Sequence, residues 1–353
     1  MGKIKKVLLV VPPGTSFIQS DGRKQCKECF PPLGLAYLAA QLIKVGYDVQ
    51  VYDMVVEKFY HETVVSFDTV LYGATYADYR KKLEQYCPDL VGIQCMLSSR
   101  SKTVLNLCEI TKEFNRKIYT ILGGHHATAL PGHVLQNDTD FVVLGEADQS
   151  FGELVNALNN ENDISKIAGI AYKQNNAIVV QPRVDFLKNL DSLPFPAWDV
   201  VGLEKYWQGM LPMGIPLKKQ KYGVVNTSRG CPHSCYYCAV PLHTGERNYR
   251  KRNLNSVINE IKWLVDTFGV EEIHFSDDNF FVGKERLKKL CQLLIDNFPQ
   301  MNFAVPTGTD IQNVEFELID LLKQAGFYHL AIGIETANRD FQGKYVDKKI
   351  DLT

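Results

Sequence analysis

The stretch KYGVVNTSRGCPHSCYYC, residues 221–238, decides the second half of the fold, because an apolar β-type run leads directly into three closely spaced cysteines. Cys231, Cys235 and Cys238 follow the pattern C-x-x-x-C-x-x-C. Loops at the carboxyl ends of parallel strands are where β/α barrels place their chemistry. The stretch therefore predicts a metal-binding loop that follows the first strand of a parallel sheet.

The residues after this loop continue an alternation of strands and helices. Apolar β-type runs recur at 271–279, 302–308 and 328–336, and amphipathic helical patterns lie between them, around 254–268, 284–298 and 315–326. Strands that alternate with helices form a parallel sheet. We expect about four β/α steps, which make a partial barrel.

The first 160 residues show a second series of the same kind. Short, continuous apolar runs alternate with amphipathic stretches, and the runs lie at 6–12, 48–54, 89–97, 117–124 and 141–148. Strands buried on both faces read this way in parallel, doubly wound sheets, whose ligands sit beyond the carboxyl ends of the strands. The fold class is therefore α/β, with a first domain at 1–160 and a second at 216–353.

A connector is expected at 161–215, between the two domains. Asn175-Asn176 separates two β-type runs and predicts the turn of a hairpin. Pro194 and Pro196 exclude a helix from the segment around them.

Composition excludes several classes of protein. The chain has 353 residues, 45% of them hydrophobic, and a net charge of -1, which indicates a globular protein without a basic footprint for nucleic acid. No apolar segment approaches the roughly 18 to 20 residues that span a bilayer. Nine cysteines, an odd number, argue against a disulfide framework and for reduced thiols. A cytoplasmic protein without a membrane span is expected.

Three clustered thiols leave two metal sites open as interpretations. A four-iron four-sulfur cluster is usually held by four cysteines, so three would leave one iron open for another ligand. A structural zinc site would instead be closed by a fourth protein ligand, such as His233 or His243.

The cysteine motif, with Tyr237 before its last cysteine, resembles the signature of the radical S-adenosylmethionine superfamily. Two later stretches extend the likeness in order, HFSDDNFF (274–281) and AIGIET (331–336). The resemblance implies a partial radical S-adenosylmethionine barrel. It also implies that the three thiolates hold a four-iron four-sulfur (4Fe-4S) cluster whose open iron binds S-adenosylmethionine.

The first half resembles the Rossmann-like, cobalamin-binding domain that precedes this barrel in one large subgroup. The matching pieces are VVPP (10–13), FPPLGLAYLAAQL (30–42), GGHHAT (123–128), LGEAD (144–148) and LPFPAWD (193–199). The resemblance implies bound cobalamin. The candidate cobalamin-binding residues follow the predicted strands and are Pro13, Gln94, Ser98, Gly123, Gly124, His125, Gly145 and Glu146.

Cobalamin is expected without an axial histidine, because the D-x-H-x-x-G pattern that supplies one in other cobalamin proteins does not occur. His125 and His126 are then ordinary polar contacts. Gly123 and Gly124 would let the backbone approach the ligand closely, although a tight turn explains them equally well.

Other side chains are expected to contact S-adenosylmethionine. Ser276, Asp277 and Asp278 end a predicted strand and would accept hydrogen bonds from its ammonium group or ribose, although the same residue types also suit a turn with a helix cap. Glu335 would contact it by resemblance. Arg250 and Arg252 are interpreted as solvated, and no catalytic residue is assigned.

Residues outside these motifs are interpreted as structural. They are Cys26 and Cys29, the single cysteines Cys87, Cys95, Cys108 and Cys291 as buried thiols, and Tyr60 and Phe67 as core aromatics.

The resemblance implies a cobalamin-dependent radical enzyme that cleaves S-adenosylmethionine reductively and methylates an unactivated carbon. Cyclisation or rearrangement with the same cofactors is an alternative, and a non-catalytic metal- or cofactor-binding protein is another. Expected partners are a small-molecule or peptide substrate and an external low-potential electron donor, such as flavodoxin or ferredoxin. The family's barrel has six β/α units, so we expect a C-terminally truncated chain, or one completed by another chain.

Overall fold

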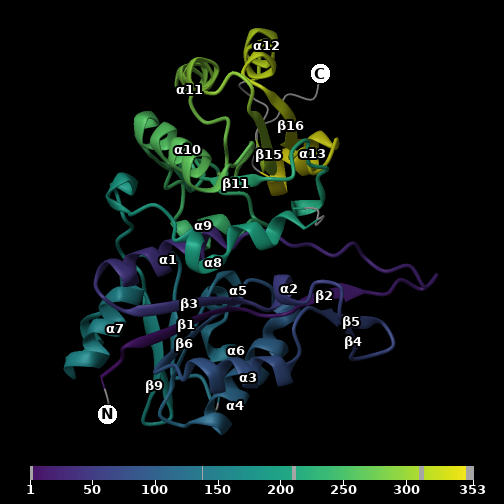
Figure 1. Cartoon of the computed structure of the whole chain (residues 1–353). Helices are drawn as coiled ribbons and strands as arrows, with labels where there is room; N and C mark the ends of the chain where they lie inside the picture. The colour runs from purple at the N-terminus through teal and green to yellow at the C-terminus, as the bar shows by residue number, and fades with distance from the viewer. Residues whose placement is uncertain (1–2, 137, 209–211, 310–313, 347–353) are drawn as a thin grey trace. The chain divides into compact units, whose positions relative to one another are not determined.

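The computed structural model describes residues 3–136, 138–208, 212–309 and 314–346 (Figure 1). The chain divides into two compact units. Unit 1 comprises residues 1–187, 193–206 and 210–214, and unit 2 comprises 188–192, 207–209 and 215–353. In the described residues, no helix is long and apolar enough to cross a membrane.

Unit 1 is built on a seven-stranded sheet in the order β10-β9-β8-β7-β6-β1-β3. The strands are β1 (Lys6–Val11), β3 (Asp48–Asp53), β6 (Leu90–Gln94), β7 (Tyr119–Gly123), β8 (Phe141–Val143), β9 (Ile170–Gln174) and β10 (Ala177–Gln181). Neighbouring strands from β3 to β8 are parallel. The strands β9 and β10 add an antiparallel hairpin to the edge of the same sheet. It turns at Asn175 and Asn176, both with positive φ, as predicted.

Helices cover both faces of this sheet, which confirms the doubly wound class. They are α1 (Leu33–Lys44), α2 (Met54–Glu57), α3 (Tyr76–Tyr86), α4 (Ser101–Phe114), α5 (His125–Ala129), α6 (Pro131–Val134), α7 (Ser150–Asn160) and α8 (Trp198–Val201). The exclusion of a helix near Pro194 and Pro196 was wrong for α8, which begins after both prolines and so contains neither. From β1 the chain passes to β3 on one side and later to β6 on the other. Ligands of open α/β sheets bind where the strand order reverses in this way.

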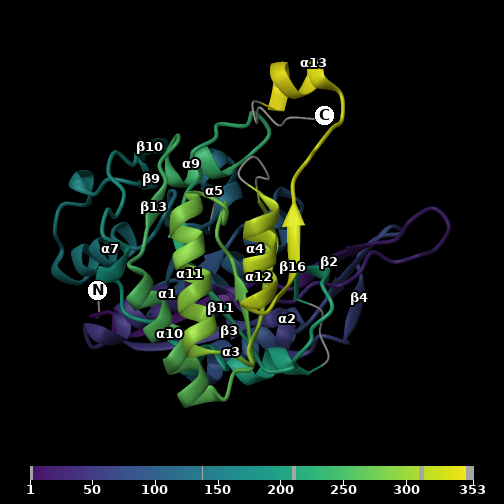
Figure 2. The same cartoon turned by 90° about the horizontal axis from the view of Figure 1, so that it is seen from above.

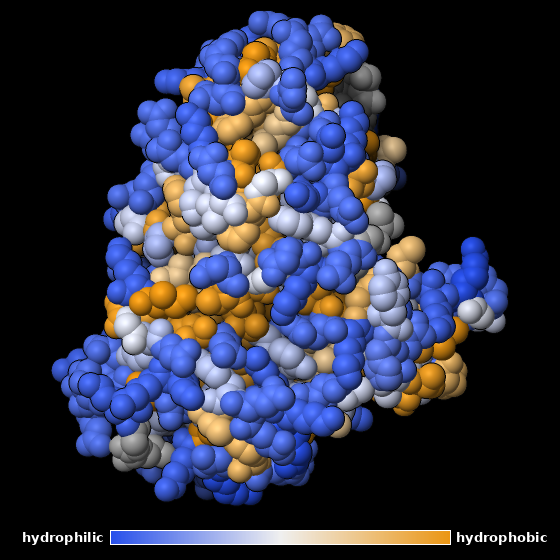
Figure 3. All heavy atoms as spheres, in the orientation of Figure 1, coloured by the Kyte–Doolittle hydropathy of each residue, from blue (hydrophilic) through white to orange (hydrophobic). Residues whose placement is uncertain are grey.

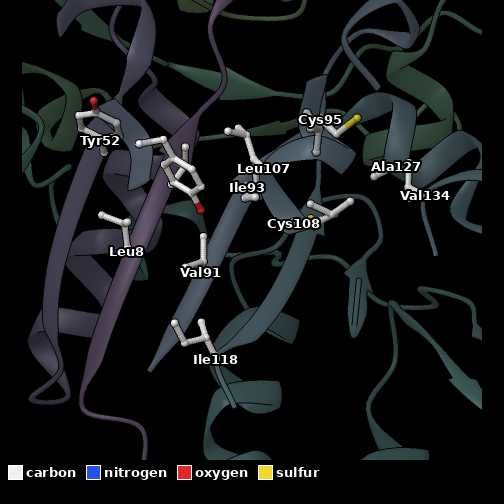
Figure 4. Close-up of a cluster of buried hydrophobic side chains, with 14 of the residues drawn as sticks. Leu8, Tyr52, Val91, Ile93, Cys95, Leu107, Cys108, Ile118, Ala127 and Val134 are labelled. Atoms are coloured by element: carbon white, nitrogen blue, oxygen red, sulfur yellow. The ribbon is translucent and has the colours of Figure 1, made fainter. Parts of the chain in front are cut away.

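One hydrophobic cluster of unit 1 lies between the sheet and the neighbouring helices α3 and α4. Figure 4 shows Leu107 and Cys108 of α4 beside Val91 and Ile93 of β6. Because these strands are buried on both faces, their sequences are continuously apolar rather than alternating. The core therefore fixes the strands and presents their carboxyl ends at one edge.

A small antiparallel sheet that the sequence did not predict projects from unit 1. Its order is β2-β5-β4, with the bounds β2 (Gly14–Phe17), β4 (Glu62–Val64) and β5 (Thr69–Tyr72). Phe67 is 94% exposed and Tyr60 74% exposed, so their assignment to the core was wrong. Figure 3 shows apolar surface on this projecting arm.

Unit 2 is built on a four-stranded parallel sheet in the order β11-β14-β15-β16. The strands are β11 (Tyr222–Val225), β14 (Glu272–Phe275), β15 (Asn302–Thr309) and β16 (Phe327–Ile332). Three long helices connect them, α10 (Leu254–Phe268), α11 (Lys284–Asn297) and α12 (Phe316–Gln324), with α11 beside α12 (Figure 2). The four strands and the three connecting helices predicted from the sequence are therefore present.

Shorter elements complete unit 2. They are the two-stranded ribbon β12 (Ser228–Arg229) and β13 (Arg250–Lys251), the helices α9 (Val240–Thr244) and α13 (Arg339–Phe341), and a π-helical turn at Gln342–Val346. Residues 347–353 lie outside the described residues.

Candidate functional site

The three cysteines lie on one loop between β12 and α9, beyond the carboxyl end of β11. Cys235 is buried, and Cys231 and Cys238 are partly exposed. The loop begins at Gly230, whose φ is +81° and where an added Cβ would lie 1.9 Å from the carbonyl oxygen of Asn248. Only glycine tolerates both conditions, so the chain needs a glycine directly before the first thiol.

Two carboxylates at the end of β14 hold the segment that leads into this loop. Asp277 is fully buried and accepts hydrogen bonds from the Thr227 backbone N–H, the Thr227 hydroxyl and the Ser228 hydroxyl. Asp278 accepts one from the backbone N–H of Gly230, at 2.7 Å. Both side chains therefore bind the protein itself, immediately before Cys231.

The surroundings of Asp277 also determine its charge. Burial raises the pKa of its carboxyl group to about 6, and the hydrogen bonds from Ser228 and Thr227 oppose that effect. Its direct contact with S-adenosylmethionine stays a prediction. The geometry already gives this carboxylate a structural task. Asp278 and Ser276 are only half-buried and lie beside it.

Asn279, which the sequence analysis did not single out, reaches the first thiol. Its Nδ2 lies 3.7 Å from Sγ of Cys231, and Oδ1 accepts a hydrogen bond from the Thr309 hydroxyl at 3.0 Å. The available signal was its position directly after the two aspartates in HFSDDNFF.

Glu335 follows β16 and meets the cysteine loop from another strand end. The hydroxyl of Tyr237 forms hydrogen bonds with the Glu335 carboxylate and with Cys235. Burial is the largest cause of the raised pKa of Tyr237, and the Glu335 contact adds to it. Glu335 has a φ of +62°, an unusual backbone conformation for a residue with a side chain.

The donor set fits a four-iron cluster. In the described residues, no three His, Cys, Asp or Glu side chains converge as ligands of a single metal ion. The thiolates that hold a four-iron cluster bind separate irons, so they do not need to converge on one point. Three thiols on one loop therefore suit a cluster that keeps one iron without a protein ligand.

The interpretation of Arg250 and Arg252 as solvated residues was wrong, because both are buried. The guanidinium group of Arg252 donates to the buried carboxylate of Glu260 and to the carbonyl oxygen of Asn226. Burial raises the pKa of Glu260, and Arg252 acts in the opposite direction. A buried arginine held in this way supports the end of β11.

In unit 1 the candidate cobalamin residues gather along the carboxyl edge of the parallel sheet. Gln94 of β6 pairs with Gly123 of β7, and Gly123 pairs in turn with Val143 of β8. The backbone N–H of Gly145 donates to the Thr128 hydroxyl at 2.9 Å. The remaining candidates lie on the same strand-end loops and are Pro13, Ser98, Gly124, His125 and Glu146.

The backbone at this edge of the sheet requires a glycine at position 124. Its φ is +106°, and an added Cβ would lie 2.8 Å from Sδ of Met96 and 2.9 Å from the Cys95 carbonyl oxygen. At Gly123, an added Cβ would meet only the Val143 carbonyl oxygen, at 3.7 Å. The turn therefore explains why residue 124 is a glycine, but it does not explain Gly123.

His126 is hydrogen-bonded through both ring nitrogens. Nδ1 lies 2.8 Å from the Ser98 hydroxyl, and Nε2 lies 3.1 Å from Nδ1 of His133. Burial, and then the neighbouring His133, lower the pKa of His126. Both ring nitrogens of His126 are therefore already hydrogen-bonded to side chains of the protein.

The remaining cysteines are mostly placed as interpreted. Cys95, Cys108 and Cys291 are buried, and burial raises the pKa of each to about 12. Cys87 is exposed, so its interpretation as a buried thiol was wrong. It ends α3 in the left-handed conformation, with a φ of 50°. Cys87 therefore caps the end of a helix and does not belong to an apolar core.

A thiol loop at the carboxyl edge of one parallel sheet, together with a separate doubly wound domain, defines a cluster-binding protein with a second cofactor domain. Family models agree: a B12 binding domain matches residues 23–155, and the radical SAM superfamily matches residues 225–351. The chain belongs to the radical SAM superfamily, in the group that carries a B12-binding domain. Cobalamin, a 4Fe-4S cluster and S-adenosylmethionine are its cofactors.

Curated relatives match almost the whole length of this chain. An uncharacterized methyltransferase of Pyrococcus horikoshii is 30% identical over 95% of this chain and 66% of the relative. The cytidylyl-2-hydroxyethylphosphonate methyltransferase of Streptomyces wedmorensis is 28% identical over 99% of this chain and 68% of its own length. An anaerobic magnesium-protoporphyrin IX monomethyl ester cyclase of Synechocystis is 26% identical, over 94% and 61%. The chain thus spans about two thirds of the length of these relatives.

The fold is also that of a solved enzyme. The radical S-adenosylmethionine methyltransferase TsrM from Kitasatospora setae, with cobalamin and a [4Fe-4S] cluster bound, matches with a TM-score of 0.70 at 19% identity. The match covers 98% of this chain and 62% of TsrM.

Proposed function

We propose that this chain is the cofactor-binding part of a cobalamin-dependent radical S-adenosylmethionine methyltransferase that acts on an unactivated carbon. One observation carries the proposal. The cysteine loop is held by Asp277 and Asp278 from the end of β14, and Tyr237 in the loop contacts Glu335 beyond β16. Strand ends of one parallel sheet therefore converge on the three thiols.

Each residue has a proposed task in this site. Cys231, Cys235 and Cys238 would hold the cluster as thiolates. Glu335, with Ser276 and Asp278 beside the loop, would orient the ammonium group and ribose of S-adenosylmethionine by accepting hydrogen bonds. When bound, the cluster supplies the electron for reductive cleavage of S-adenosylmethionine, and cobalamin supplies a methyl carrier.

In unit 1 the proposed cobalamin contacts are the strand-end residues. The loops after β1, β6, β7 and β8 end at the same edge, and the side chains there are small or polar. The set comprises Pro13, Gln94, Ser98, Gly123, Gly124, His125, Gly145 and Glu146. Because Ser98 and His133 occupy His126, cobalt would have no ligand from that side chain.

The domain boundaries stay a prediction. Residues 1–160 would form the cobalamin domain, 161–215 a connector whose hairpin adds to the first sheet, and 216–353 the radical domain. We also propose a cytoplasmic location, a small-molecule or peptide substrate, no nucleic-acid partner, and an external low-potential electron donor such as flavodoxin or ferredoxin.

Anaerobic reconstitution with iron and sulfide tests the cluster. We expect acid-labile sulfide, about four irons per chain and a cluster resonance spectrum, all lost in Cys235→Ala. Cys87→Ala is the matched control, because Cys87 is an exposed thiol outside the loop. Stoichiometric zinc without sulfide in the wild-type chain would contradict the proposal.

A radical cyclase is the second candidate, because three relatives are named as cyclases. The two activities differ in their products. With cobalamin and S-adenosylmethionine present, a methyltransferase forms S-adenosylhomocysteine in step with methylated product. A cyclase forms neither.

A further inference from the structure

We infer that Asn279 is a positioning residue that sets the reduction potential of the cluster by donating a hydrogen bond to the sulfur of Cys231. The inference rests on the proposed function, because it requires a cluster on the three thiols. Asn279 is 3% exposed, and its Nδ2 lies 3.7 Å from Sγ of Cys231. Neither Asp277 nor Asp278, its neighbours in sequence, is able to donate there when ionised.

The orientation of the Asn279 amide is fixed by a second buried side chain. The Thr309 hydroxyl, 2% exposed, accepts a hydrogen bond from the backbone N–H of Phe281 at 3.2 Å. Its single hydrogen is then donated to Oδ1 of Asn279, at 3.0 Å. With Oδ1 held by Thr309, the NH2 group faces Cys231. An iron-bound thiolate has no proton, so it accepts from this group.

The donor to the sulfur of Cys231 is a buried side chain, because Asn279 is almost fully removed from solvent. Water does not compete with a buried amide for the sulfur, so this hydrogen bond keeps its full strength.

A hydrogen bond to a cluster sulfur stabilises the reduced state more than the oxidised one, because the reduced cluster carries one more negative charge. Such bonds are among the factors that set cluster potentials. Asn279 would therefore raise the potential, so that an external donor is able to reduce the cluster. Thr309 would act through Asn279 and have a smaller effect.

The test compares three variants with the wild-type chain, all reconstituted anaerobically with iron and sulfide. Asn279→Leu removes the donor at similar volume, and Thr309→Val removes the hydroxyl that orients it. Thr309→Ser keeps that hydroxyl and is the matched control. The midpoint potential of the cluster is measured by a resonance-monitored redox titration with a low-potential reductant, together with iron and sulfide per chain.

We expect a more negative midpoint potential in Asn279→Leu, a smaller shift in the same direction in Thr309→Val, and the wild-type value in Thr309→Ser. Unchanged potentials in both of the first two variants, at full cluster content, would overturn the inference. If Asn279→Leu does not hold the cluster, the potential of Thr309→Val decides. A wild-type chain that assembles no cluster would instead refute the proposed function, and the inference with it.

Discussion

Asp53 in unit 1 and Asp277 in unit 2 are both fully buried carboxylates at the carboxyl end of a parallel strand, and burial raises the pKa of each to about 6. Their partners differ. Asp53 accepts from the backbone N–H groups of Val55 and Val56, at the start of α2, and from the Tyr206 hydroxyl. Asp277 accepts from the segment that precedes the cysteine loop.

The comparison shows that burial and pKa alone do not identify a functional carboxylate. Two groups with the same electrostatic character serve a helix start in one unit and a cofactor loop in the other. What distinguishes them is the segment to which their hydrogen bonds lead. The following predictions test this distinction, from the largest expected effect to the smallest.

Replacing either carboxylate by alanine is expected to lower the free energy of unfolding more than any other change. Asp277→Ala leaves three buried donors without an acceptor, so we expect the free energy of unfolding to fall by about 4 kcal/mol. Asp53→Ala also leaves three donors without an acceptor, so the free energy of unfolding should fall by a similar amount. Urea denaturation monitored by circular dichroism measures both.

The two alanine variants should differ in cluster content. Iron and sulfide per folded chain are expected to fall sharply in Asp277→Ala and to stay at the wild-type level in Asp53→Ala. Equal losses in the two variants would break the comparison, since the hydrogen bonds of Asp53 lead to the start of α2 and to Tyr206.

The pH dependence of stability follows from the raised pKa values. A carboxyl group with a folded-state pKa of about 6, above its ordinary 3.8, binds its proton more tightly in the folded state. Its contribution is therefore fully present below pH 4 and is lost as the pH rises through 6. For each carboxylate, this loss corresponds to about 3 kcal/mol.

The variants Asp53→Asn and Asp277→Asn remove this pH dependence one site at a time. Between pH 4 and pH 7, the unfolding free energy of the wild-type chain should fall by about 3 kcal/mol more than that of either variant. Chemical denaturation at several pH values measures the difference. If the stability of a variant varies with pH in the same way as that of the wild-type chain, the pKa of the replaced carboxyl group is not raised by folding.

Two adjacent glycines extend the comparison to the cobalamin edge, where backbone rather than buried charge shapes the site. Gly124→Ala forces a side chain into a positive-φ turn against Cys95, so we expect a loss of about 2 kcal/mol in stability. Gly123→Ala has ordinary contacts and should leave stability unchanged. Thermal unfolding measures both.

Cobalamin titration then separates the roles of these glycines. Weaker cobalamin binding in Gly123→Ala at unchanged stability would place that glycine against the ligand. Unaltered binding would remove Gly123 from the proposed contact set.

Deleting single hydroxyl donors is expected to have the smallest effect. Tyr206→Phe removes one donor to Asp53, and Ser228→Ala removes one donor to Asp277. Each should cost about 1 kcal/mol in unfolding free energy and raise the pKa of its carboxylate further. Only Ser228→Ala should also alter the cluster content. A loss of cluster in Tyr206→Phe would argue against the assignment of Asp53 to structure alone.

Regular β/α elements were predictable from the sequence because each one buries a long apolar face. The helix at Leu254–Phe268 has the expected bounds, and the parallel strands differ from expectation by a few residues. The projecting sheet escaped prediction because β4 has only three residues, none of them buried, so no alternation marks it. Exposed aromatic residues such as Phe67 then resembled core residues.

The site was predictable in part. The spacing of the three cysteines is a local property, and the sequence shows it directly. The partners of Asp277, in contrast, lie 49 and 50 residues away, so no local pattern indicated that the carboxylate points into the protein. The ion pair of Arg252 with Glu260 spans only eight residues, but the burial that distinguishes it from a solvated pair depends on how α10 packs, which no local pattern shows.

Three consecutive residues, Asp277, Asp278 and Asn279, bind three successive points of another strand end: Thr227 with Ser228, then Gly230, then Cys231. The two segments, 227–231 and 277–279, are therefore paired in a fixed register. Inserting or deleting one residue in either segment would displace all three contacts at once, whereas lengthening the loop after Cys238 would leave the contacts in place. Chimeras that exchange cluster loops between relatives should consequently exchange both segments together.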